Sequence, residues 1–226
     1  MIETFNINHQ DDSIPVAVSR PSGEPRGGVL ILASIFGNDQ GTLSVAEELA
    51  RHQLLAVVPA LFFRGDSGPR GFEAAEKESA FARMRAYDQA RGVEDLTAVA
   101  RWMRGELQRV GGRDHIVAHG ICFGGHLAAH LACRGEVNAL STVHGGRLDQ
   151  VSAQHALSVP AALHFGDQDS AIPLEKVEEI GSHWPEAEVF IHEGAAHGFA
   201  HPNASAFVPD AYQASFQHLL RLTTAH

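Results

Sequence analysis

The sequence predicts an α/β protein whose mostly parallel central sheet is covered by helices on both faces. From about residue 27 onward, short continuous apolar runs alternate with longer segments whose apolar residues recur every three or four positions. Continuous apolar runs are expected for parallel strands, because both faces of such strands are buried. Strands that alternate with helices in this way build a parallel sheet, and ligand sites form at the carboxyl ends of its strands.

The first half of the chain supplies three expected strand regions and one helix. Before residue 27, short alternating stretches indicate an N-terminal hairpin. Residues 29–33 (VLILA) form the first buried strand, and residues 40–52 form a helix whose apolar side chains share one face. Residues 54–58 (LLAVV) form the next strand, and the glycine- and arginine-rich residues 64–71 form a loop.

The rest of the chain continues the same alternation. The strongest helix signal runs from residue 92 to about residue 108, where apolar residues recur at alternating steps of three and four. Residues 115–120 (HIVAHG) form a strand, and the glycine pair 124–125 opens the helix that follows it. The remaining strands are expected at 139–143, 161–165 and 188–192, and the remaining helices at 173–180, begun by a proline, and at 207–223.

Composition excludes several classes of partner. We expect one domain over residues 1–226, because α/β folds of this length keep a single core. A formal net charge of -10 without a basic stripe argues against nucleic acid, and no apolar run approaches the ~20 residues of a membrane span. A polar, acidic start argues against a signal peptide, and two cysteines cannot form a disulfide framework, so we expect the cytoplasm. No HExxH or CxxC spacing is present, so no metal is expected.

A nucleophile motif lies between the strand at 115–120 and the next helix. Gly120-Ile121-Cys122-Phe123-Gly124 has the form G-x-nucleophile-x-G, which in this strand–turn–helix context is typical of the α/β-hydrolase fold. The turn is so tight that the nucleophile is strained and its flanking positions are glycines. The helix N-terminus beneath Cys122 favours a thiolate. The alternative is that Cys122 is a buried, inert cysteine before an ordinary turn. For Cys133, which lies mid-helix among apolar residues, we prefer the interpretation as an inert cysteine.

An acid and a histidine follow the nucleophile in the chain order that this fold requires. Asp167 and Asp169 follow the strand at 161–165, and we favour Asp169 as the acid because it lies deeper in the loop. His197 follows the strand at 188–192 in a run of small residues, which allows its loop to fold back over the sheet. Each of these features is common alone, but their order and placement together predict a Cys122–His197–Asp169 triad.

These residues resemble the dienelactone hydrolase family over nearly the whole chain, from about residue 27 onward. The resemblance implies an α/β-hydrolase with the triad Cys122, Asp169 and His197, and it places the acid four residues before a proline. It also implies an oxyanion hole made by the backbone N–H groups of Ile35 and Phe123. The segments that carry it are IFG at 35–37, GICFGG at 120–125, HGG at 144–146, GDQDSAIP at 166–173 and GAAHGFA at 194–200.

Two positions depart from the family pattern. Ser34 stands where the founding enzymes have a glutamate that helps to ionise the cysteine, and His201 stands where they have an arginine that holds the substrate carboxylate. Replacement cations for that carboxylate come from a helix before the nucleophile motif: Lys77, Arg83 and Arg85. The candidates for the substrate pocket are Ser34, Phe36, His144, Phe199 and His201.

The sequence therefore predicts a hydrolase that cleaves a small carboxylic ester or lactone through an acyl-cysteine intermediate. It predicts no cofactor and no partner other than the small substrate, in a monomer or homodimer. Acyl transfer to an alcohol or amine would use the same residues. The alternative is a non-hydrolytic protein in which Cys122 is a redox-sensing thiol or the cleft only binds a ligand, although redox sensing requires no acid such as Asp169.

Overall fold

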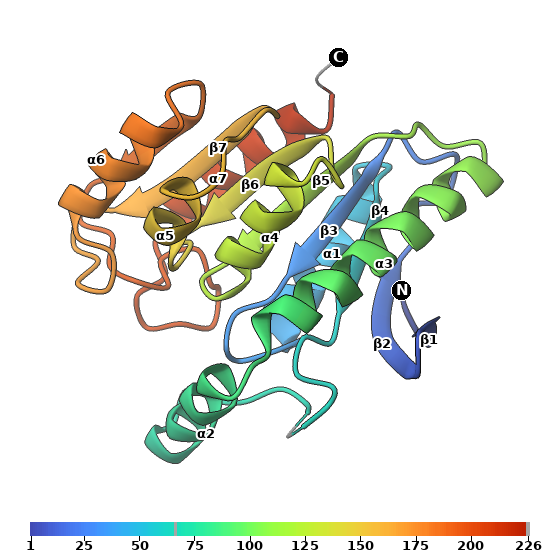
Figure 1. Ribbon diagram of the computed structural model, residues 1–226, viewed down its shortest axis with the longest axis horizontal. Helices are drawn as coiled ribbons and strands as arrows, with labels where there is room; N and C mark the ends of the chain where they lie inside the picture. Colours follow the sequence, from blue (N-terminus) through green and yellow to red (C-terminus); the bar gives the residue numbers. More distant parts are fainter. Residues whose placement is uncertain (66, 225–226) are drawn as a thin grey trace.

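The computed structural model describes residues 1–65 and 67–224, so Asp66 of the expected loop lies outside it. Eight strands and seven helices lie within these residues (Figure 1). The strands are β1 (Ile2–His9), β2 (Asp12–Ser19), β3 (Gly28–Leu32), β4 (Leu55–Pro59), β5 (Ile116–Ile121), β6 (Ala139–Val143), β7 (Ala161–Gly166) and β8 (Glu188–His192). The helices are α1 (Gln40–Arg51), α2 (Ala74–Arg85), α3 (Gln89–Arg109), α4 (Gly124–Cys133), α5 (Leu148–Ser152), α6 (Leu174–His183) and α7 (Pro209–Leu222).

All eight strands form one sheet in the order β1-β2-β4-β3-β5-β6-β7-β8. The expected N-terminal hairpin is present, because β1 pairs antiparallel with β2, and β2 pairs antiparallel with β4. From β4 to β8 every neighbouring pair is parallel, which confirms the predicted α/β-hydrolase architecture. The chain leaves β3 toward β4 and later returns to the opposite side of β3 with β5. In sheets with such a reversal, ligands bind at the carboxyl ends of the strands on either side of it, here β3 and β5.

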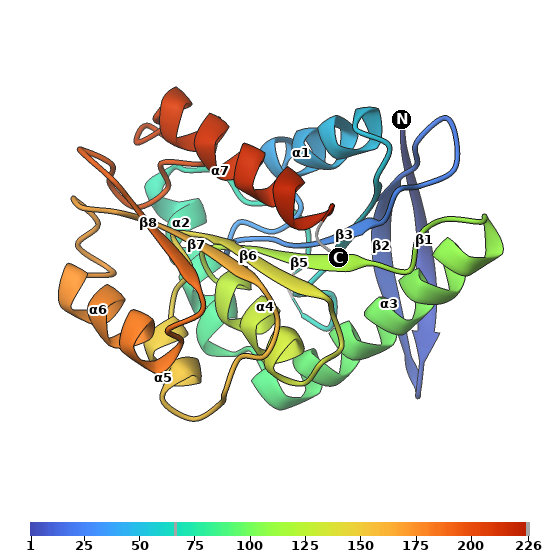
Figure 2. The same cartoon turned by 90° about the horizontal axis from the view of Figure 1, so that it is seen from above.

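Helices cover both faces of the sheet, and the two-residue period of the strands supplies a core to each face. In β3, Leu30 and Leu32 pack into the cluster that includes α3 and α4, whereas Val29 and Ile31 pack into the cluster that includes α1 and α7. Figure 2 shows α1 and α7 on one side of the sheet and α3 to α6 on the other. None of the described helices has the length and apolar character that a membrane span requires.

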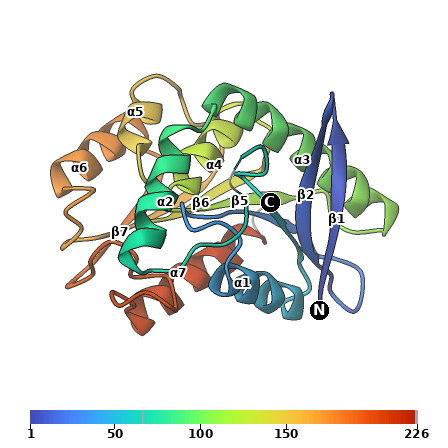
Figure 3. The ribbon, with the colours of Figure 1, turned by 90° about the horizontal axis from the view of Figure 1, so that it is seen from below.

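The sequence predictions miss α5 as an element and give no bounds for α2. α5 has five residues, too few to show a helical period. α2 buries only Ala80 and Arg83, so it has almost no apolar face. Figures 1 and 3 show α2 standing away from the sheet, on the side where the parallel strands end. The other helices match within about three residues at either end; α3, for example, begins at Gln89 because Asp88 accepts a hydrogen bond from the Arg91 N–H.

Candidate active site

Cys122 occupies the strained turn between β5 and α4. Its φ is 50°, a left-handed conformation that side chains other than glycine rarely adopt. A Cβ at Gly120 would lie 2.6 Å from the Gly124 carbonyl oxygen, and one at Gly124 would lie 2.0 Å from the carbonyl oxygen of Leu32. Both flanking glycines are therefore required by close backbone packing, and the turn presents the cysteine at the end of the strand.

The side chains of Cys122, His197 and Asp169 form a continuous hydrogen-bonded chain. His197 Nε2 lies 3.1 Å from Cys122 Sγ, and His197 Nδ1 lies 2.7 Å from Asp169 Oδ2. The three residues come from the loops after β5, β7 and β8, which end at the same edge of the sheet. The order of loops inferred from the sequence thus brings together a sulfur, a base and a carboxylate at hydrogen-bonding distances.

The hydrogen bonds of His197 favour its protonated form. Burial lowers the pKa of His197, but its hydrogen bonds to Asp169 and Cys122 outweigh the burial and raise that pKa to about 10. At neutral pH the ring therefore carries a positive charge, balanced by the carboxylate on one side. A protonated His197 that donates to Sγ stabilises the thiolate form of the cysteine, which is its nucleophilic form.

The backbone N–H groups of Ile35 and Phe123, the predicted oxyanion donors, have no hydrogen-bond acceptor among the described residues. Phe123 follows the sulfur directly at the N-terminus of α4, and Ile35 follows β3, the strand next to β5. Both donors therefore follow neighbouring strands at the edge of the sheet that carries Cys122.

The loop that carries Ile35 is fixed by Arg83 of α2. The Arg83 guanidinium donates to the Ile35 carbonyl through Nε (2.9 Å) and Nη2 (2.6 Å), and to the Gly68 carbonyl through Nη1 (2.7 Å). The same group lies 4.4 Å from the centre of the Phe62 ring. Of the three candidate cations, Arg83 is thus buried and engaged with backbone carbonyls, whereas Lys77 and Arg85 are exposed on the surface of α2.

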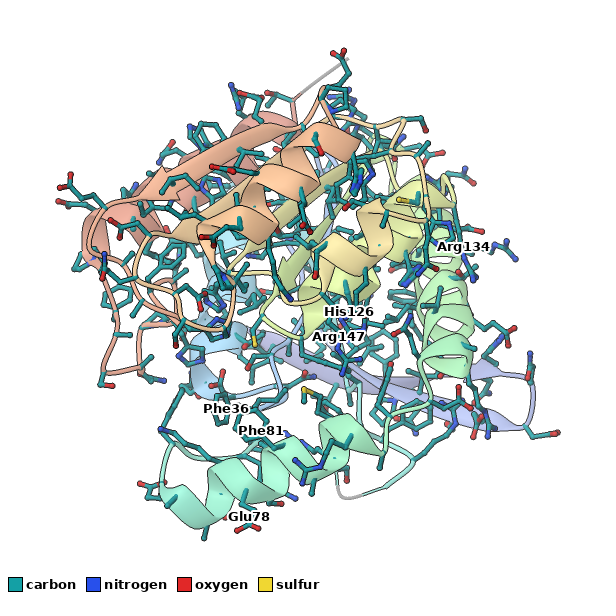
Figure 4. All side chains as sticks on the ribbon, turned by 60° about the vertical axis from the view of Figure 1, so that its left-hand side comes forward. Phe36, Glu78, Phe81, His126, Arg134 and Arg147 are labelled. Atoms are coloured by element: carbon teal, nitrogen blue, oxygen red, sulfur yellow. The ribbon has the colours of Figure 1, made fainter. Side chains whose placement is uncertain are left out.

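The five candidates for the substrate pocket have different positions. Ser34 is buried, and its hydroxyl accepts a hydrogen bond from the Phe36 N–H within its own turn. Phe199 is fully buried and packs in the core cluster that includes α1 and α7. Phe36 remains partly exposed, and its ring centre lies 4.4 Å from that of Phe72. In Figure 4, Phe36 and Phe81 lie where α2 faces the rest of the molecule.

His201, the position of the family arginine, is engaged inside the protein. Its Nε2 lies 2.7 Å from Asp39 Oδ2, and its Nδ1 accepts a hydrogen bond from the Asn203 N–H. An Nδ1 that accepts leaves Nε2–H as the donor to Asp39, which also caps the N-terminus of α1 through Thr42. Burial would raise the pKa of Asp39, but the hydrogen bonds from His201 and Thr42 lower it. His201 therefore has no free donor for a substrate carboxylate.

The ring of His144 packs against that of His197. Its ring centre lies 4.8 Å from that of His197, and its side chain is almost fully buried. Burial holds the pKa of His144 well below the usual value, so the ring is neutral. One donor atom each from Cys122, His144 and His197 lie within 4.8 Å of one another, the one group in the described part of the chain that could hold a metal ion.

A cavity of 560 Å³ lies beside this site and not within it. Its lining comes from the turn that contains Phe62 and from α2 and α3, including Arg83 and Tyr87. None of Cys122, Asp169 and His197 contributes to it. Phe62 lines the cavity and stacks on Phe123, with 5.4 Å between the ring centres, so the cavity borders the aromatic packing next to Cys122.

The chain is similar to known proteins over most of its length. The model of the dienelactone hydrolase family matches residues 14–225. A protein of Azospirillum brasilense, provisionally named a carboxymethylenebutenolidase, is 27% identical over 214 residues, covering 89% of this chain and 88% of its own. Carboxymethylenebutenolidase 1 of Cupriavidus pinatubonensis is 28% identical over 170 residues, covering 74% and 71%. A crystal structure from Klebsiella pneumoniae, provisionally named a dienelactone hydrolase, has a TM-score of 0.83 at 21% identity and covers 100% and 99% of the two chains.

Proposed function

Because this chain belongs to the dienelactone hydrolase family and is a hydrolase of esters or lactones, we propose that it acts through Cys122, His197 and Asp169 on a small neutral substrate. Family membership also argues against the non-hydrolytic alternative. The observation that supports the proposed mechanism most directly is the hydrogen-bonded chain from Cys122 Sγ through both nitrogens of His197 to Asp169 Oδ2. A sulfur, a base and an orienting acid in this arrangement are the parts that covalent acyl chemistry needs.

In the first half of the reaction, the Cys122 thiolate attacks the carbonyl carbon. The carbonyl oxygen becomes an oxyanion that the Ile35 and Phe123 N–H groups stabilise by a few kcal/mol. As the intermediate collapses, His197 gives its Nε2 proton to the leaving alkoxide, and an acyl-cysteine thioester remains. In the second half, His197 removes a proton from water, the hydroxide attacks the thioester, and the carboxylic acid leaves as the thiolate is restored. Asp169 stabilises the charged imidazole throughout.

The test of this mechanism compares the two cysteines. We expect Cys122→Ala to abolish hydrolysis of p-nitrophenyl acetate, and iodoacetamide to alkylate Cys122 first, with parallel loss of activity. Cys133 is the matched control, because burial raises its pKa to about 11 and so keeps it protonated. Peptide mapping by mass spectrometry reads the order of labelling. Activity that survives complete labelling of Cys122, or earlier labelling of Cys133, would contradict the assignment.

The structure also supports a neutral substrate. A buried substrate carboxylate without a paired cation costs several kcal/mol. His201 is bound to Asp39, and Arg83 is bound to the Ile35 and Gly68 carbonyls, so neither offers an uncommitted charge. We therefore expect a higher kcat/KM for a neutral ester than for its carboxylate-bearing analogue with the same leaving group at pH 7–8. A preference for the charged ester that disappears in Arg83→Met or Lys77→Met would contradict this and favour a dienelactone-like substrate.

A further inference from the structure

Three potential metal ligands converge from three different loops. Cys122 follows β5, His144 follows β6, and His197 lies in the loop after β8. Their donor atoms, Sγ and one ring nitrogen of each histidine, all lie within 4.8 Å of one another. No local sequence spacing connects them, which explains why motif reasoning predicts no metal here.

His144 lies beside the proposed triad but has no role in the proposed hydrolysis. Only 2% of its surface is exposed, and neither ring nitrogen has a hydrogen-bond partner among the described residues. Its ring instead faces His197 at 4.8 Å between centres and Phe199 at 5.4 Å. Burying an imidazole without a hydrogen-bond partner costs free energy. The unpartnered nitrogen lone pair of His144 is therefore available to a ligand.

The backbone around His144 holds this ring beside the sulfur. The Cys122 N–H donates to the Val143 carbonyl, and the Gly146 N–H donates to the Cys122 carbonyl, so the two turns are joined on both sides of the histidine. The His144 N–H donates to the His164 carbonyl of β7. His144 itself has a φ of 38°, a left-handed conformation that the surrounding contacts must maintain.

We propose that Cys122, His144 and His197 form a binding site for one zinc ion, which reversibly blocks the nucleophile. Thiolate and imidazole are ligands that zinc prefers, and three protein ligands leave the fourth tetrahedral position to water. Asp169 holds the Nδ1 side of His197, the carboxylate–histidine arrangement that orients zinc-binding imidazoles.

The distances require only a small adjustment. Ordinary zinc–sulfur and zinc–nitrogen bonds in a tetrahedron separate the donor atoms by roughly 3.3–3.6 Å. Sγ and Nε2 are 3.1 Å apart, so that pair opens slightly, while His144 moves toward them from no more than 4.8 Å. The ion takes the place of the proton that Cys122 and His197 share, and that proton passes to solvent.

Binding to this cluster stops hydrolysis, because it occupies both Sγ and the Nε2 that the reaction needs. The inhibition rests on the proposed function, whereas metal binding itself does not. Binding is therefore tested without substrate, on protein freed of metal with a chelator. Cobalt(II) is the spectroscopic probe, because its thiolate complexes show a charge-transfer band and tetrahedral geometry intensifies its visible bands; zinc affinity is measured by competition with a chromophoric chelator.

His144→Asn is the decisive variant, since asparagine tolerates a left-handed backbone and only the imidazole is removed. We expect one zinc ion per wild-type chain and at least a tenfold loss of affinity in His144→Asn. His126→Asn is the matched control, because His126 is also buried and unpartnered but lies on α4 outside the cluster. The thiolate–cobalt band should disappear in Cys122→Ser and persist in Cys133→Ala.

Unchanged zinc affinity in His144→Asn, or a thiolate–cobalt band that persists in Cys122→Ser, would overturn the site. Circular dichroism of each variant shows whether a loss of binding reflects unfolding, and Cys122→Ser provides a second test that does not alter the left-handed position. Wild-type protein that binds cobalt at Cys122 but hydrolyses no ester would support the metal site and count against the proposed function alone.

Discussion

Asp167 and Asp169 stand two residues apart in the loop after β7, and their surroundings give them different partners. The Asp169 side chain is fully buried; Oδ2 faces His197, and Oδ1 accepts hydrogen bonds from the N–H groups of Ala171 and Ile172. Asp167 is partly exposed, and its Oδ1 accepts a hydrogen bond at 2.7 Å from the N–H of Gly194, in the loop of the histidine. Asp169 can stabilise charge on His197, whereas Asp167 ties two loops together.

This difference predicts that the same substitution lowers kcat strongly at Asp169 and only slightly at Asp167. Asp169→Asn should lower kcat by at least about a hundredfold, because an amide cannot stabilise the imidazolium and can impose the wrong tautomer. Asp167→Asn keeps an oxygen that can accept from Gly194, so kcat should change less than about threefold. Steady-state kinetics on one neutral ester measures both variants. A larger loss in Asp167→Asn would mean that the acid is assigned to the wrong residue.

At the scale of elements, the sequence specifies what depends on local pattern and misses what depends on long-range contacts. The strands and the Cys122 turn could be predicted from local sequence. Continuous apolar runs indicate buried strands, and the glycines around Cys122 indicate close backbone packing. The extent of α2 could not, since this helix has almost no apolar face and is held mainly through Arg83. The pairing of His201 with Asp39 joins positions 162 residues apart, so no local sequence pattern predicts it.

The attachment of α2 through Arg83 predicts a catalytic effect at a distance. Arg83→Met removes three hydrogen bonds to backbone carbonyls and frees the loop whose Ile35 N–H is proposed to hold the oxyanion. We expect kcat for a neutral ester to fall about tenfold with little change in KM, since loss of oxyanion stabilisation acts on the transition state. Arg85→Met, on the exposed side of the same helix, is the control and should match the wild type.

The KM measured with a charged ester separates this role from direct substrate binding. If Arg83 contacted a substrate carboxylate, Arg83→Met would raise KM for the charged ester alone and leave the neutral ester unaffected. Arg83→Lys keeps a cation but lacks the forked geometry of the guanidinium. If Arg83 acts by fixing the loop that carries Ile35, the kcat of Arg83→Lys should lie between those of Arg83→Met and the wild type.

Over the whole molecule, the fold buries several histidines that take no part in the proposed reaction. His164 of β7 is fully buried; its Nδ1 lies 3.0 Å from Nε2 of His192, and its Nε2 lies 3.4 Å from Nδ1 of His218 on α7. Burial, reinforced by the neighbouring histidines, lowers the pKa of His164 to about 2. Burial likewise lowers the pKa of His119 and of His126 to about 4. The fold thus holds these rings neutral well below the pH at which they would ordinarily protonate.

This burial predicts that the protein loses stability in mild acid. Above pH 6.5 the rings are neutral in both states, so they contribute no pH dependence. Below pH 6.5 these histidines bind protons in the unfolded chain but stay neutral in the folded protein. The free energy of unfolding therefore falls by about 1.4 kcal/mol per pH unit for each ring. At pH 5 one ring costs about 2 kcal/mol, and three together approach the total stability of a typical domain.

Urea denaturation at pH 7 and pH 5 measures this loss, and substitution of one ring identifies its source. His164→Phe keeps an aromatic ring stacked on Phe190 but removes the titrating group. Between pH 7 and pH 5, its free energy of unfolding should therefore fall by about 2 kcal/mol less than that of the wild type. His155→Phe, at an exposed ring, is the matched control and should retain the wild-type pH dependence. Equal losses in wild-type and His164→Phe protein would show that the acid sensitivity arises elsewhere in the molecule.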